Sequence, residues 1–504
     1  MNYCEKLTAK SYSMYWANFL HIYQPPNQMA DILERIVNES YRKLIEGLRK
    51  NPRAKITLNI NAGLTEQLAE HGYKDVIDGI RFLLERGQIE LTETAKYHPF
   101  LPLTPMEEII RQINLNRDTN RRFFGPAYRP VGFFPPEMAY SHRVAEAAAQ
   151  MGFEWIIIDE IAFSGKTEQV PYDKIFTIHR HPNLKVLFRE RRLSNLIMSA
   201  IVRNEKTLTE VMGDELKKNR YLITAMDGET FGHHRPGLEK LLFQIFQSKK
   251  FRFATISELI KQFPSTEAIE PVASNWASAE IDIEEKKQFL SWDDPENPIH
   301  KWQWELTSFA LKLMERADPK AKGFKEARAK MDRALHSCQY WWACAKPWWS
   351  LEMIEAGAFR LLDTIRSIPG AKNGDIEKAF DLYQKIVLKA FEWQRTGYIR
   401  KLAAQQRQWA RIPFGDRAKA GEYPAFMEMM KREMNRAAKR QEFEKAILWR
   451  DAMTKLENKT DVYDAIHVVD QLRANTDNSE VEALIKKYKK QYQKIRGGQP
   501  EQRG

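Results

Sequence analysis

Short apolar runs alternate with amphipathic stretches over the first half of the chain. The apolar runs read WANFLHIY, KITLNIN, GQIELTE, VGFFPPE, FEWIIIDE, NLKVLFRE and NRYLITAMD, and several of them end in polar or charged residues. Between them lie stretches such as YKDVIDGIRFLLERG and SHRVAEAAAQMG, whose apolar residues recur with helical spacing. Strand-length runs that alternate with helices predict βαβ units and a parallel sheet. We therefore expect an α/β fold whose strands close into a barrel.

The pattern changes near the segment FPSTEAIEPVASNWAS, after which helical spacing dominates. The stretches PIHKWQWELTSFALKLMERA and GDIEKAFDLYQKIVLKAFEWQRTGY follow, and the break RIPFGDRAKAGEYPAF, with its prolines and glycines, separates them from a last helical pair. We predict a barrel domain over residues 1–270, an α-helical domain over 271–410, and a terminal helical module with a basic tail over 411–504.

Charge and cysteine content indicate which partners and which cellular compartment to expect. The formal net charge is +12, but the basic residues are spread along the chain and are densest in the last hundred residues. That distribution is typical of a solvated helical face or tail, so nucleic acid is not the expected partner. Three cysteines cannot form a disulfide framework, and no apolar run reaches the length of a signal peptide or a membrane span. We expect a cytoplasmic protein without a membrane partner.

Two carboxyl groups close predicted strands and are the strongest candidates for chemistry. Glu137 ends the run VGFFPPE, and Asp227 ends the run YLITAMD. Active sites of parallel barrels gather where strands end and loops begin, so both side chains are expected at one mouth. A pair of carboxyl groups on either side of a sugar can cleave a glycosidic bond with retention of configuration. An isolated carboxylate would more often be a helix cap or a surface ion-pair partner, but dense polar and aromatic clusters surround both of these.

Other candidates carry weaker signals. The charged residues of FEWIIIDE and LFRERRLS could either line the site or form structural ion pairs, and the sequence does not separate these roles. These residues are Asp159, Glu160, Arg189, Glu190 and Arg191. Neither the pair His179 and His181 nor the pair His233 and His234 has the His-x-x-x-His spacing that places two ligands on one helix face. We therefore predict hydrogen-bonding or surface histidines and no metal site.

Four segments occur in an order that resembles a known family. They are HIYQPP, GQIEL followed by TAKYHPFLPL, GFFPPEMAYS, and MDGETFGHH. Together they look like the successive signature regions of the family 57 glycoside hydrolases, which include α-amylases, 4-α-glucanotransferases, amylopullulanases and glucan branching enzymes. The resemblance implies an incomplete (β/α)7 barrel followed by an α-helical domain that completes the active site. It also implies a retaining mechanism on α-glucans and no need for a metal or other cofactor.

The resemblance also implies roles for individual residues. Glu137 corresponds to the nucleophile and Asp227 to the general acid/base. The expected substrate-binding residues are His21, Tyr23, Gln24, Glu90, His98, Phe134, Glu229, Phe231, His233, Trp276 and Trp341. Tyr23 stands where the family often has a second histidine, and we expect this departure to alter fine specificity and not the reaction. For the tryptophans, packing in the core is the alternative to a sugar platform.

Residues 426–457 read FMEMMKREMNRAAKRQEFEKAILWRDAMTKLE, with apolar residues at helical spacing on both sides of RQEFE. This stretch resembles the UVR motif, a small helical hairpin that mediates protein–protein contact. The resemblance implies a protein partner or self-association, and an ordinary helical hairpin is the alternative.

Three functions remain open at this point. The leading hypothesis is a retaining hydrolase or glucanotransferase that cleaves α-glucosidic bonds of α-glucans through a covalent glycosyl-enzyme. The second is a non-catalytic carbohydrate-binding or scaffold protein. The third is a metal-dependent carbohydrate deacetylase or α-mannosidase, which would need a cluster of Asp and His ligands. Hydrolysis, transfer and branching are not separated by the sequence.

Overall fold

The computed structural model describes residues 14–346, 348–405, 413–418, 420–461, 468–469, 472, 476 and 478–495. The chain forms two compact units, one of residues 1–228 and 243–405 and the other of residues 229–242 and 406–504. Cys4 and the last nine residues of the predicted basic tail lie outside the described residues. The predicted domain boundaries near residues 270 and 410 stay predictions.

Seven parallel strands of the first unit form a ring. They are β1 (Tyr15–Ile22), β2 (Ile56–Ile60), β3 (Ile89–Leu91), β4 (Gly132–Phe133), β5 (Trp155–Asp159), β7 (His181–Arg189) and β8 (Tyr221–Asp227). The ladder β3-β2-β1-β8 is one parallel sheet, and β4-β5-β7 are parallel neighbours in the other. Glu93 joins the two on one side, because its N–H donates to Gly132 O (2.8 Å) and its C=O accepts from Phe134 N–H (2.9 Å). On the other side Glu190 N–H donates to Ile223 O (2.8 Å).

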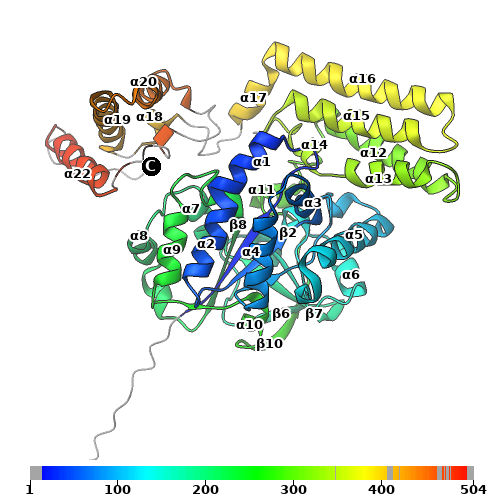
Figure 1. Ribbon diagram of the computed structural model, residues 1–504, viewed down its shortest axis with the longest axis horizontal. Helices are drawn as coiled ribbons and strands as arrows, with labels where there is room; N and C mark the ends of the chain where they lie inside the picture. The colour runs from blue at the N-terminus through cyan, green and yellow to red at the C-terminus, as the bar shows by residue number, and fades with distance from the viewer. Residues whose placement is uncertain are drawn as a thin grey trace, which may run out of the picture. The chain divides into compact units, whose positions relative to one another are not determined.

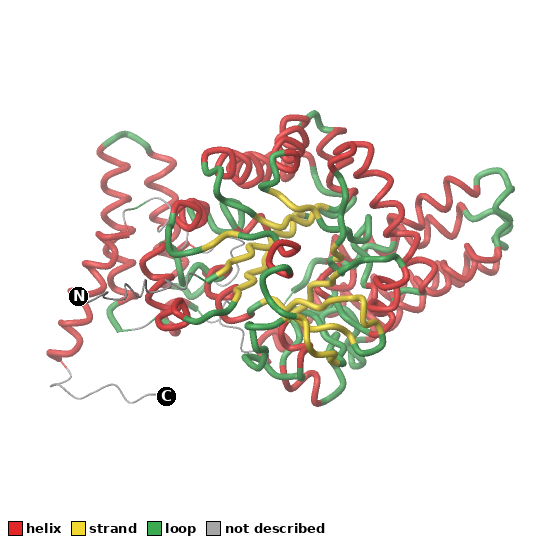
Figure 2. Tube along the Cα trace, turned by 90° about the horizontal axis from the view of Figure 1, so that it is seen from below, coloured by secondary structure: helices red, strands yellow, loops and turns green. Residues whose placement is uncertain are grey.

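The predicted α/β class with a seven-stranded barrel is therefore confirmed, and Figure 2 shows the strands inside and the helices around them. Three short strands were not predicted from the sequence. They are β6 (Ile175–Ile178), β9 (Arg252–Phe253) and β10 (Ser265–Ile269). β6 pairs antiparallel with β7 and parallel with β10, so it extends the second sheet beyond the ring.

Helices cover the outside of the ring, as Figure 1 shows. They are α1 (Ala30–Ile36), α2 (Arg42–Lys50), α3 (Ala62–Glu70), α4 (Lys74–Glu85), α5 (Met106–Phe124), α6 (His142–Gln150), α7 (Arg191–Met198), α8 (Glu205–Met212) and α10 (Ile256–Ile260). The helix α9 (Glu239–Gln247) begins in the second unit and ends in the first. Several begin at side-chain caps: Asn61 caps α3, Glu190 caps α7, and Thr255 forms a capping box with Glu258 on α10. These caps start the helices directly after strand ends or turns, which keeps the loops short at the barrel mouth.

The barrel core is apolar and closely packed. It includes Phe19, Phe134, Ile156, Trp155 and Ile223, all fully buried. Gly132 of β4 shows how close the packing is, because a Cβ at this position would stand 2.1 Å from the Trp155 indole. Only glycine fits there without displacing the ring.

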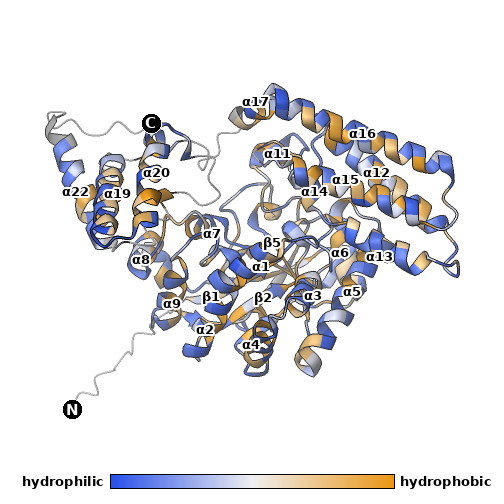
Figure 3. Cartoon of the chain, turned by 45° about the horizontal axis from the view of Figure 1, so that its top comes forward, coloured by the Kyte–Doolittle hydropathy of each residue, from blue (hydrophilic) through white to orange (hydrophobic). Residues whose placement is uncertain are grey.

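The rest of the first unit is helical, as predicted. It comprises α11 (Glu280–Glu284), α12 (Pro298–Arg316), α13 (Phe324–Ala334), α14 (Cys338–Trp341), α15 (Leu351–Ser367), α16 (Asn373–Thr396) and α17 (Tyr398–Gln405). These helices share an apolar core, and Figure 3 shows the longer ones banded in blue and orange, as expected for amphipathic helices. Arg111 of α5 donates to both carboxylate oxygens of Asp332 on α13, at 2.8 and 2.6 Å. Ser337 N–H donates to His98 O (2.9 Å), so the α13–α14 turn lies against the barrel mouth.

The second unit contains α18 (Phe414–Arg417), α19 (Glu422–Lys439), α20 (Phe443–Glu457) and α22 (Asn478–Ile495). α19 and α20 form a hairpin around a core of Phe426, Met430, Trp449 and Leu456. The basic run KKYKKQYQK lies within α22, which packs on α19. No helix among the described residues is long and apolar enough to cross a membrane.

Candidate active site

The structure brings Glu137 and Asp227 to the same end of the barrel. Asp227 is the last residue of β8, and it is in register with His21 near the end of β1. Glu137 lies in the short 3-10 turn Pro136–Met138, which follows β4. Asp227 is near enough for its negative charge to raise the pKa of Glu137. The two carboxyl groups therefore face a common space.

The backbone at Glu137 is held in a conformation that non-glycine residues seldom adopt. Glu137 has φ 62° and ψ 16°, and the next residue, Met138, has φ 48°. Two consecutive left-handed residues cost energy, and such strain persists only where surrounding contacts impose it. Here Met138 N–H donates to Pro135 O (2.8 Å), and Trp276 N–H donates to Glu137 O (3.3 Å). The turn aims the side chain of Glu137, which is 17% exposed, between buried neighbours.

Both carboxyl groups have raised pKa values. Burial, and then the charge of Asp227, raises the pKa of Glu137 to about 8, against a hydrogen bond from the indole Nε1 of Trp276 to Oε2 (2.9 Å) that lowers it. Burial also raises the pKa of Asp227 to about 6, and the positive charge of Arg189 opposes that rise. Two coupled carboxyl groups lose their protons in two steps that belong to the pair. Between about pH 6 and 8 the pair therefore carries one proton.

Two buried histidines form a directional hydrogen-bond chain beside the pair. Asn59 donates through Nδ2 to Thr92 Oγ1 (2.8 Å), so its Oδ1 accepts from Nδ1 of His21 (2.7 Å). His21 then has an acceptor at Nε2, which lies 3.2 Å from Nε2 of His98. His98 must donate there, and its Nδ1 accepts from the Ser337 hydroxyl (3.0 Å). This chain assigns one tautomer to each imidazole.

Burial keeps both imidazoles neutral. It lowers the pKa of His21 to about 4, and burial together with the nearby His21 and His336 lowers the pKa of His98 well below its usual range. His98 Nδ1 lies 3.7 Å from Oε1 of Glu137, too far for a hydrogen bond. The histidines therefore shape the site without a positive charge that would offset the carboxyl groups.

Tyr23 closes one side of this cluster. Its ring stacks on His98 with centroids 4.1 Å apart and an interplanar angle of 16°. Its hydroxyl lies 3.2 Å from Sγ of Cys338 on α14, and either atom can donate. Burial raises the pKa of the Cys338 thiol to about 12, so the sulfur is a neutral hydrogen-bond partner. Tyr23 thus links the barrel to the helical part of the first unit.

Other predicted binding residues lie beneath the site. Phe134 is fully buried, with its ring 4.8 Å from that of His21 and 5.1 Å from that of Phe19, so it is a packing platform under the histidine. Gln24 is also buried, where its Nε2 donates to Tyr41 Oη (3.3 Å) and its Oε1 accepts from Gln28 (2.7 Å). Both therefore support neighbouring side chains.

Glu90 lies one layer deeper in the barrel than the carboxyl pair. It is in register with Thr57, whereas His21 pairs with Asn59 two residues further along β2. Its Oε2 accepts from Thr57 Oγ1 and from Ser257 N–H at the start of α10, both at 3.2 Å. The structure does not bring Glu90 to the pair.

Two further groups of predicted residues differ in their surroundings. Trp341 is half-buried and stacks on Trp348, with centroids 4.6 Å apart. Glu229, Phe231 and His233 follow Asp227 directly but belong to the second unit, where His233 N–H donates to Glu229 O (3.1 Å). Their roles stay predictions.

Some residues of the site were missed by sequence reasoning. Asn59, Ser337 and Cys338 hold His21, His98 and Tyr23 respectively, at the distances given above. Asn59 could have been found from the sequence, because it is a polar residue near the end of the predicted strand KITLNIN. Nothing in the helical pattern around Ser337 and Cys338 points to the barrel, because that contact joins segments more than two hundred residues apart.

Among the described residues, no group of three or more His, Cys, Asp or Glu side chains is arranged to hold a metal ion. The expectation that no metal is needed stays a prediction. The charged residues Asp159, Arg189 and Arg191 form a buried ion-pair cluster behind the site, with Arg189 Nη1 2.8 Å from Asp159 Oδ2.

A parallel barrel that carries paired carboxyl groups at the ends of its strands is an arrangement suited to enzymes that cleave glycosidic bonds. The family model for glycosyl hydrolase family 57 matches residues 5–271, and the chain belongs to this family. A model for the UvrB/uvrC motif matches residues 427–459, which include most of the α19–α20 hairpin.

Characterised relatives are distant and longer. The chain is 23% identical over 286 residues to an alpha-amylase of Pyrococcus horikoshii, and 24% identical over 284 residues to a 4-alpha-glucanotransferase of Thermococcus litoralis. Each match covers 54% of this chain but only 44% and 42% of the relative, so the chain spans less than half of their length.

Solved structures share the fold. A family 57 branching enzyme from Pyrococcus horikoshii superposes with a TM-score of 0.58 at 15% identity, over 75% of this chain and 96% of that one. The Thermococcus litoralis 4-alpha-glucanotransferase superposes with a TM-score of 0.54 at 20% identity, over 70% and 58%.

Proposed function

We propose that the chain is a retaining enzyme that cleaves α-glucosidic bonds of α-glucans, with Glu137 as nucleophile and Asp227 as general acid/base. The observation that carries the proposal is that Glu137, just after β4, and Asp227, at the end of β8, lie at the same end of the barrel, near enough for the charge of Asp227 to raise the pKa of Glu137. Perturbed, interacting carboxyl groups on rigid strand ends are typical of catalytic pairs. Membership of family 57 and the activities of the named relatives, an alpha-amylase and a 4-alpha-glucanotransferase, support the substrate class.

The reaction proceeds in two balanced steps. A carboxylate oxygen of Glu137 attacks the anomeric carbon, and the bond to the departing oxygen breaks while that oxygen takes the proton of Asp227. The ionised Asp227 then takes a proton from water or from a sugar hydroxyl, whose oxygen attacks the anomeric carbon and releases Glu137. Water gives hydrolysis, and a sugar hydroxyl gives transfer or branching.

The pKa order in the free site differs from the order that the reaction needs. Glu137 holds its proton to higher pH than Asp227, whereas attack requires ionised Glu137 and protonated Asp227. Both arrangements carry one proton and one negative charge, so pH does not choose between them. A glycosidic oxygen beside Asp227 accepts a hydrogen bond only from the protonated acid. The bound substrate therefore selects the reactive arrangement.

Product analysis tests the proposal. The unmodified protein, Glu137→Gln and Asp227→Asn are incubated with maltooligosaccharides and soluble starch. Shorter products identify a hydrolase, redistributed chain lengths a 4-α-glucanotransferase, and new α-1,6 linkages a branching enzyme. Loss of that activity in both variants supports the assigned roles, and an unmodified protein that leaves every α-glucan intact would overturn the proposed function.

A matched control separates chemistry from folding. Glu93 is also buried, with a pKa raised to about 7 by burial, but its Oε1 accepts from Asn116 on α5 and from Tyr128, which follows that helix. Glu93→Gln removes a buried carboxyl group without touching the pair. It should retain activity where Glu137→Gln and Asp227→Asn do not.

Mass spectrometry of Asp227→Asn after rapid mixing with an activated glucoside should reveal a glycosyl group on Glu137.

We also propose that the α19–α20 hairpin binds another protein or a second copy of the chain. Phe443 and Ile447, one helical turn apart on α20, are 61% and 47% exposed. Exposed apolar side chains that lie side by side often mark contact surfaces. Light scattering of the purified protein and of a Phe443→Glu, Ile447→Glu variant tests self-association. If both proteins have the mass of a single chain, the proposed partner is a different protein. The search for that protein then uses the same variant as its negative control.

A further inference from the structure

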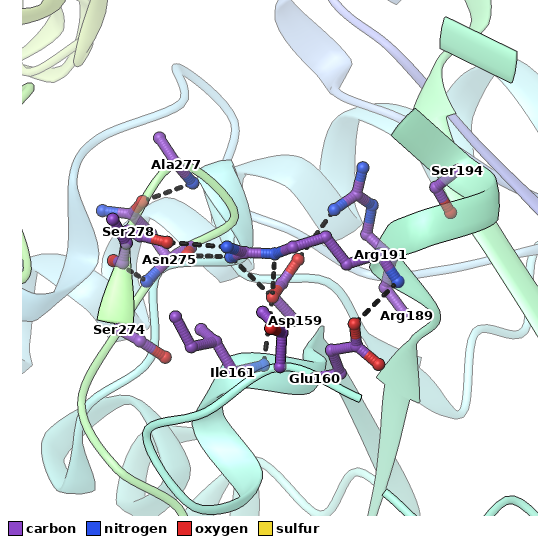
Figure 4. Close-up of polar contacts among 12 residues, drawn as sticks. Asp159, Glu160, Ile161, Arg189, Arg191, Ser194, Ser274, Asn275, Ala277 and Ser278 are labelled. Atoms are coloured by element: carbon purple, nitrogen blue, oxygen red, sulfur yellow. Dashed lines mark hydrogen bonds and ion pairs between the residues drawn. The ribbon is translucent and has the colours of Figure 1, made fainter. Parts of the chain in front are cut away.

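A buried carboxylate at the end of β5 holds two arginines, one at the end of β7 and one at the start of α7 (Figure 4). Asp159 ends β5, and its side chain is fully buried. Its Oδ2 accepts from Arg189 Nη1 (2.8 Å), and its Oδ1 accepts from Arg191 Nε (2.8 Å). Charge-assisted bonds of this kind fix the planes of both guanidinium groups. One carboxylate therefore sets the position of two cations.

Arg189 connects Asp159 to the strand that carries Asp227. Its Nε donates to the carbonyl oxygen of Ala225 (2.8 Å), two residues before Asp227 on β8. Its Nη2 donates to Asn195 Oδ1 (2.7 Å), so every arm of the guanidinium has a partner. Its positive charge also lowers the pKa of Asp227 against the effect of burial. Arg189 thus acts on the backbone and on the charge of the proposed acid/base.

Arg191 connects Asp159 to the turn that contains Trp276. Its Nη1 donates to Ser278 O (2.7 Å) and its Nη2 to Asn275 O (3.4 Å), so the guanidinium holds both ends of the turn, as Figure 4 shows. The side chain of Asn275 also stabilises the turn, because its Oδ1 accepts a hydrogen bond from Ala277 N–H (2.7 Å). Arg191 thereby restricts the two residues between Asn275 and Ser278, one of which is Trp276.

Trp276 carries this restriction to the nucleophile. Its backbone N–H donates to Glu137 O (3.3 Å), and its indole Nε1 donates to Glu137 Oε2 (2.9 Å). On the other side of the turn, Ser274 and Tyr140 exchange backbone hydrogen bonds of 2.7 and 3.2 Å. The turn is therefore anchored at both ends, once to the segment after Glu137 and once to Arg191.

We propose that Asp159 is a positioning residue for both carboxyl groups of the catalytic pair, for Glu137 through Arg191 and Trp276, and for Asp227 through Arg189. This inference rests on the proposed function of the pair. A purely structural ion-pair cluster would contribute to stability alone. A positioning cluster also controls the ionisation of Glu137 and Asp227, and that difference is measurable.

The first test compares Arg191→Gln with the unmodified protein over a range of pH. We expect kcat/KM to fall on the order of 100-fold, mainly in kcat, because small misplacement of a reacting group is costly. The upper apparent pKa of the profile should rise, since loss of the Trp276 hydrogen bond removes an effect that lowers the pKa of Glu137. Asp159→Asn should raise both the lower and the upper apparent pKa, because it releases both arginines.

A double-mutant comparison tests the route through Trp276. If Arg191 acts through the indole, Arg191→Gln combined with Trp276→Phe loses no more activity than Trp276→Phe alone. Multiplied losses and an unchanged pH profile would overturn the proposal. Arg191→Lys keeps the positive charge but cannot reach the carbonyl groups of both Asn275 and Ser278, so it should also raise the upper apparent pKa. This variant keeps the proposal testable even if Asp159→Asn does not fold.

The matched control is Arg328→Gln. Arg328 also pairs with two largely buried carboxylates, Glu108 and Asp332, on the contact between α5 and α13. It should lose stability as the Arg191 variant does, but keep the pH profile of the unmodified protein.

A readout without turnover separates this inference from the proposed function. Carboxyl-labelled glutamate allows the ionisation of Glu137 to be followed by ¹³C NMR, with Glu137→Gln to assign its signal. Inactivity of the unmodified protein on all α-glucans would refute the proposed function alone. In that case a raised midpoint for Glu137 in Arg191→Gln still supports positioning, and an unchanged midpoint refutes it.

Discussion

The imidazoles of His21 and His98 meet at their Nε2 atoms, 3.2 Å apart, and both are buried. Two imidazoles can be joined in this way only if one donates and the other accepts, and burial, which lowers the pKa of both rings, keeps both neutral. The remaining ring nitrogens are bonded to Asn59 and Ser337, which fixes the direction of the proton in each ring. The pair ties β1 to the loop that carries His98 and, through Ser337, to the helical part of the first unit.

His21→Gln should remove part of the acid sensitivity of the fold. Burial lowers the pKa of His21 to about 4, so the unfolded chain takes up a proton at a higher pH than the native state does. The contribution of His21 to the free energy of unfolding is present above about pH 6.5. It falls by about 3 kcal/mol as the pH drops toward 4. Urea unfolding at pH 7 and pH 4.5 measures this, with His142→Gln, an exposed histidine, as control. An equal decline in His21→Gln and the unmodified protein would contradict the prediction.

Glu137→Gln should stabilise the protein at alkaline pH while it abolishes turnover. The pKa of Glu137 is raised to about 8 in the native state, so its stabilising contribution is complete below about pH 4.5 and is lost as the pH rises through 8. Removing the ionisable group should therefore raise the free energy of unfolding at pH 8 by roughly 2–4 kcal/mol. Near pH 4.5 the two proteins should differ little, which serves as the internal control in chemical denaturation.

The pH dependence of kcat/KM should be bell-shaped. The pair carries one proton between about pH 6 and 8, and only that state has one nucleophile and one acid. Activity should rise as the pH passes about 6 and fall as it passes about 8, measured on a substrate without ionisable groups. A profile that is flat beyond pH 9, or that peaks below pH 5, would show that another group limits the reaction.

Tyr23→Phe and Tyr23→Ala should differ in their effect on substrate binding. Phenylalanine keeps the ring on His98 but removes the hydroxyl contact with Cys338 Sγ, which contributes about 1 kcal/mol to the folded site, so KM should rise by no more than roughly fivefold. Alanine removes the stacked ring as well and should cost more. Initial rates on maltooligosaccharides of defined length test this order. Equal effects would mean that the stacked ring contributes nothing to the site.

Sequence reasoning identified the fold and the carboxyl pair because both leave local signals. The alternation of apolar runs and helical spacing predicted all seven ring strands, and the ring is closed by short contacts such as those of Glu93. β4 is only two residues long, yet the apolar run VGFFPPE predicted it. The strands β6 and β9 were missed, and β10 lies in the segment FPSTEAIEPVASNWAS, which was interpreted as the break between domains.

The depth of a side chain in the barrel could not be predicted from its motif. Glu90 lies in one of the recognised segments, but its register with Thr57 places it one layer below His21 and Asp227. Register is set by how all strands tilt together, which a single segment does not encode. Phe134 likewise ends beneath His21, because it directly follows β4 and its ring is buried in the barrel core.

The sequence by itself determined the order of strands and helices, the family, and the two carboxyl groups, since periodicity and motif residues are local properties of the chain. The tertiary structure decided which groups act on those carboxyl groups. Trp276 meets Glu137 across 139 positions, Ser337 meets His98 across 239, and Asp159 joins Arg189 and Arg191 in one buried cluster. Such contacts depend on loops closing over long separations and on burial, which sets the pKa values of the site, and neither is encoded in any short stretch of residues.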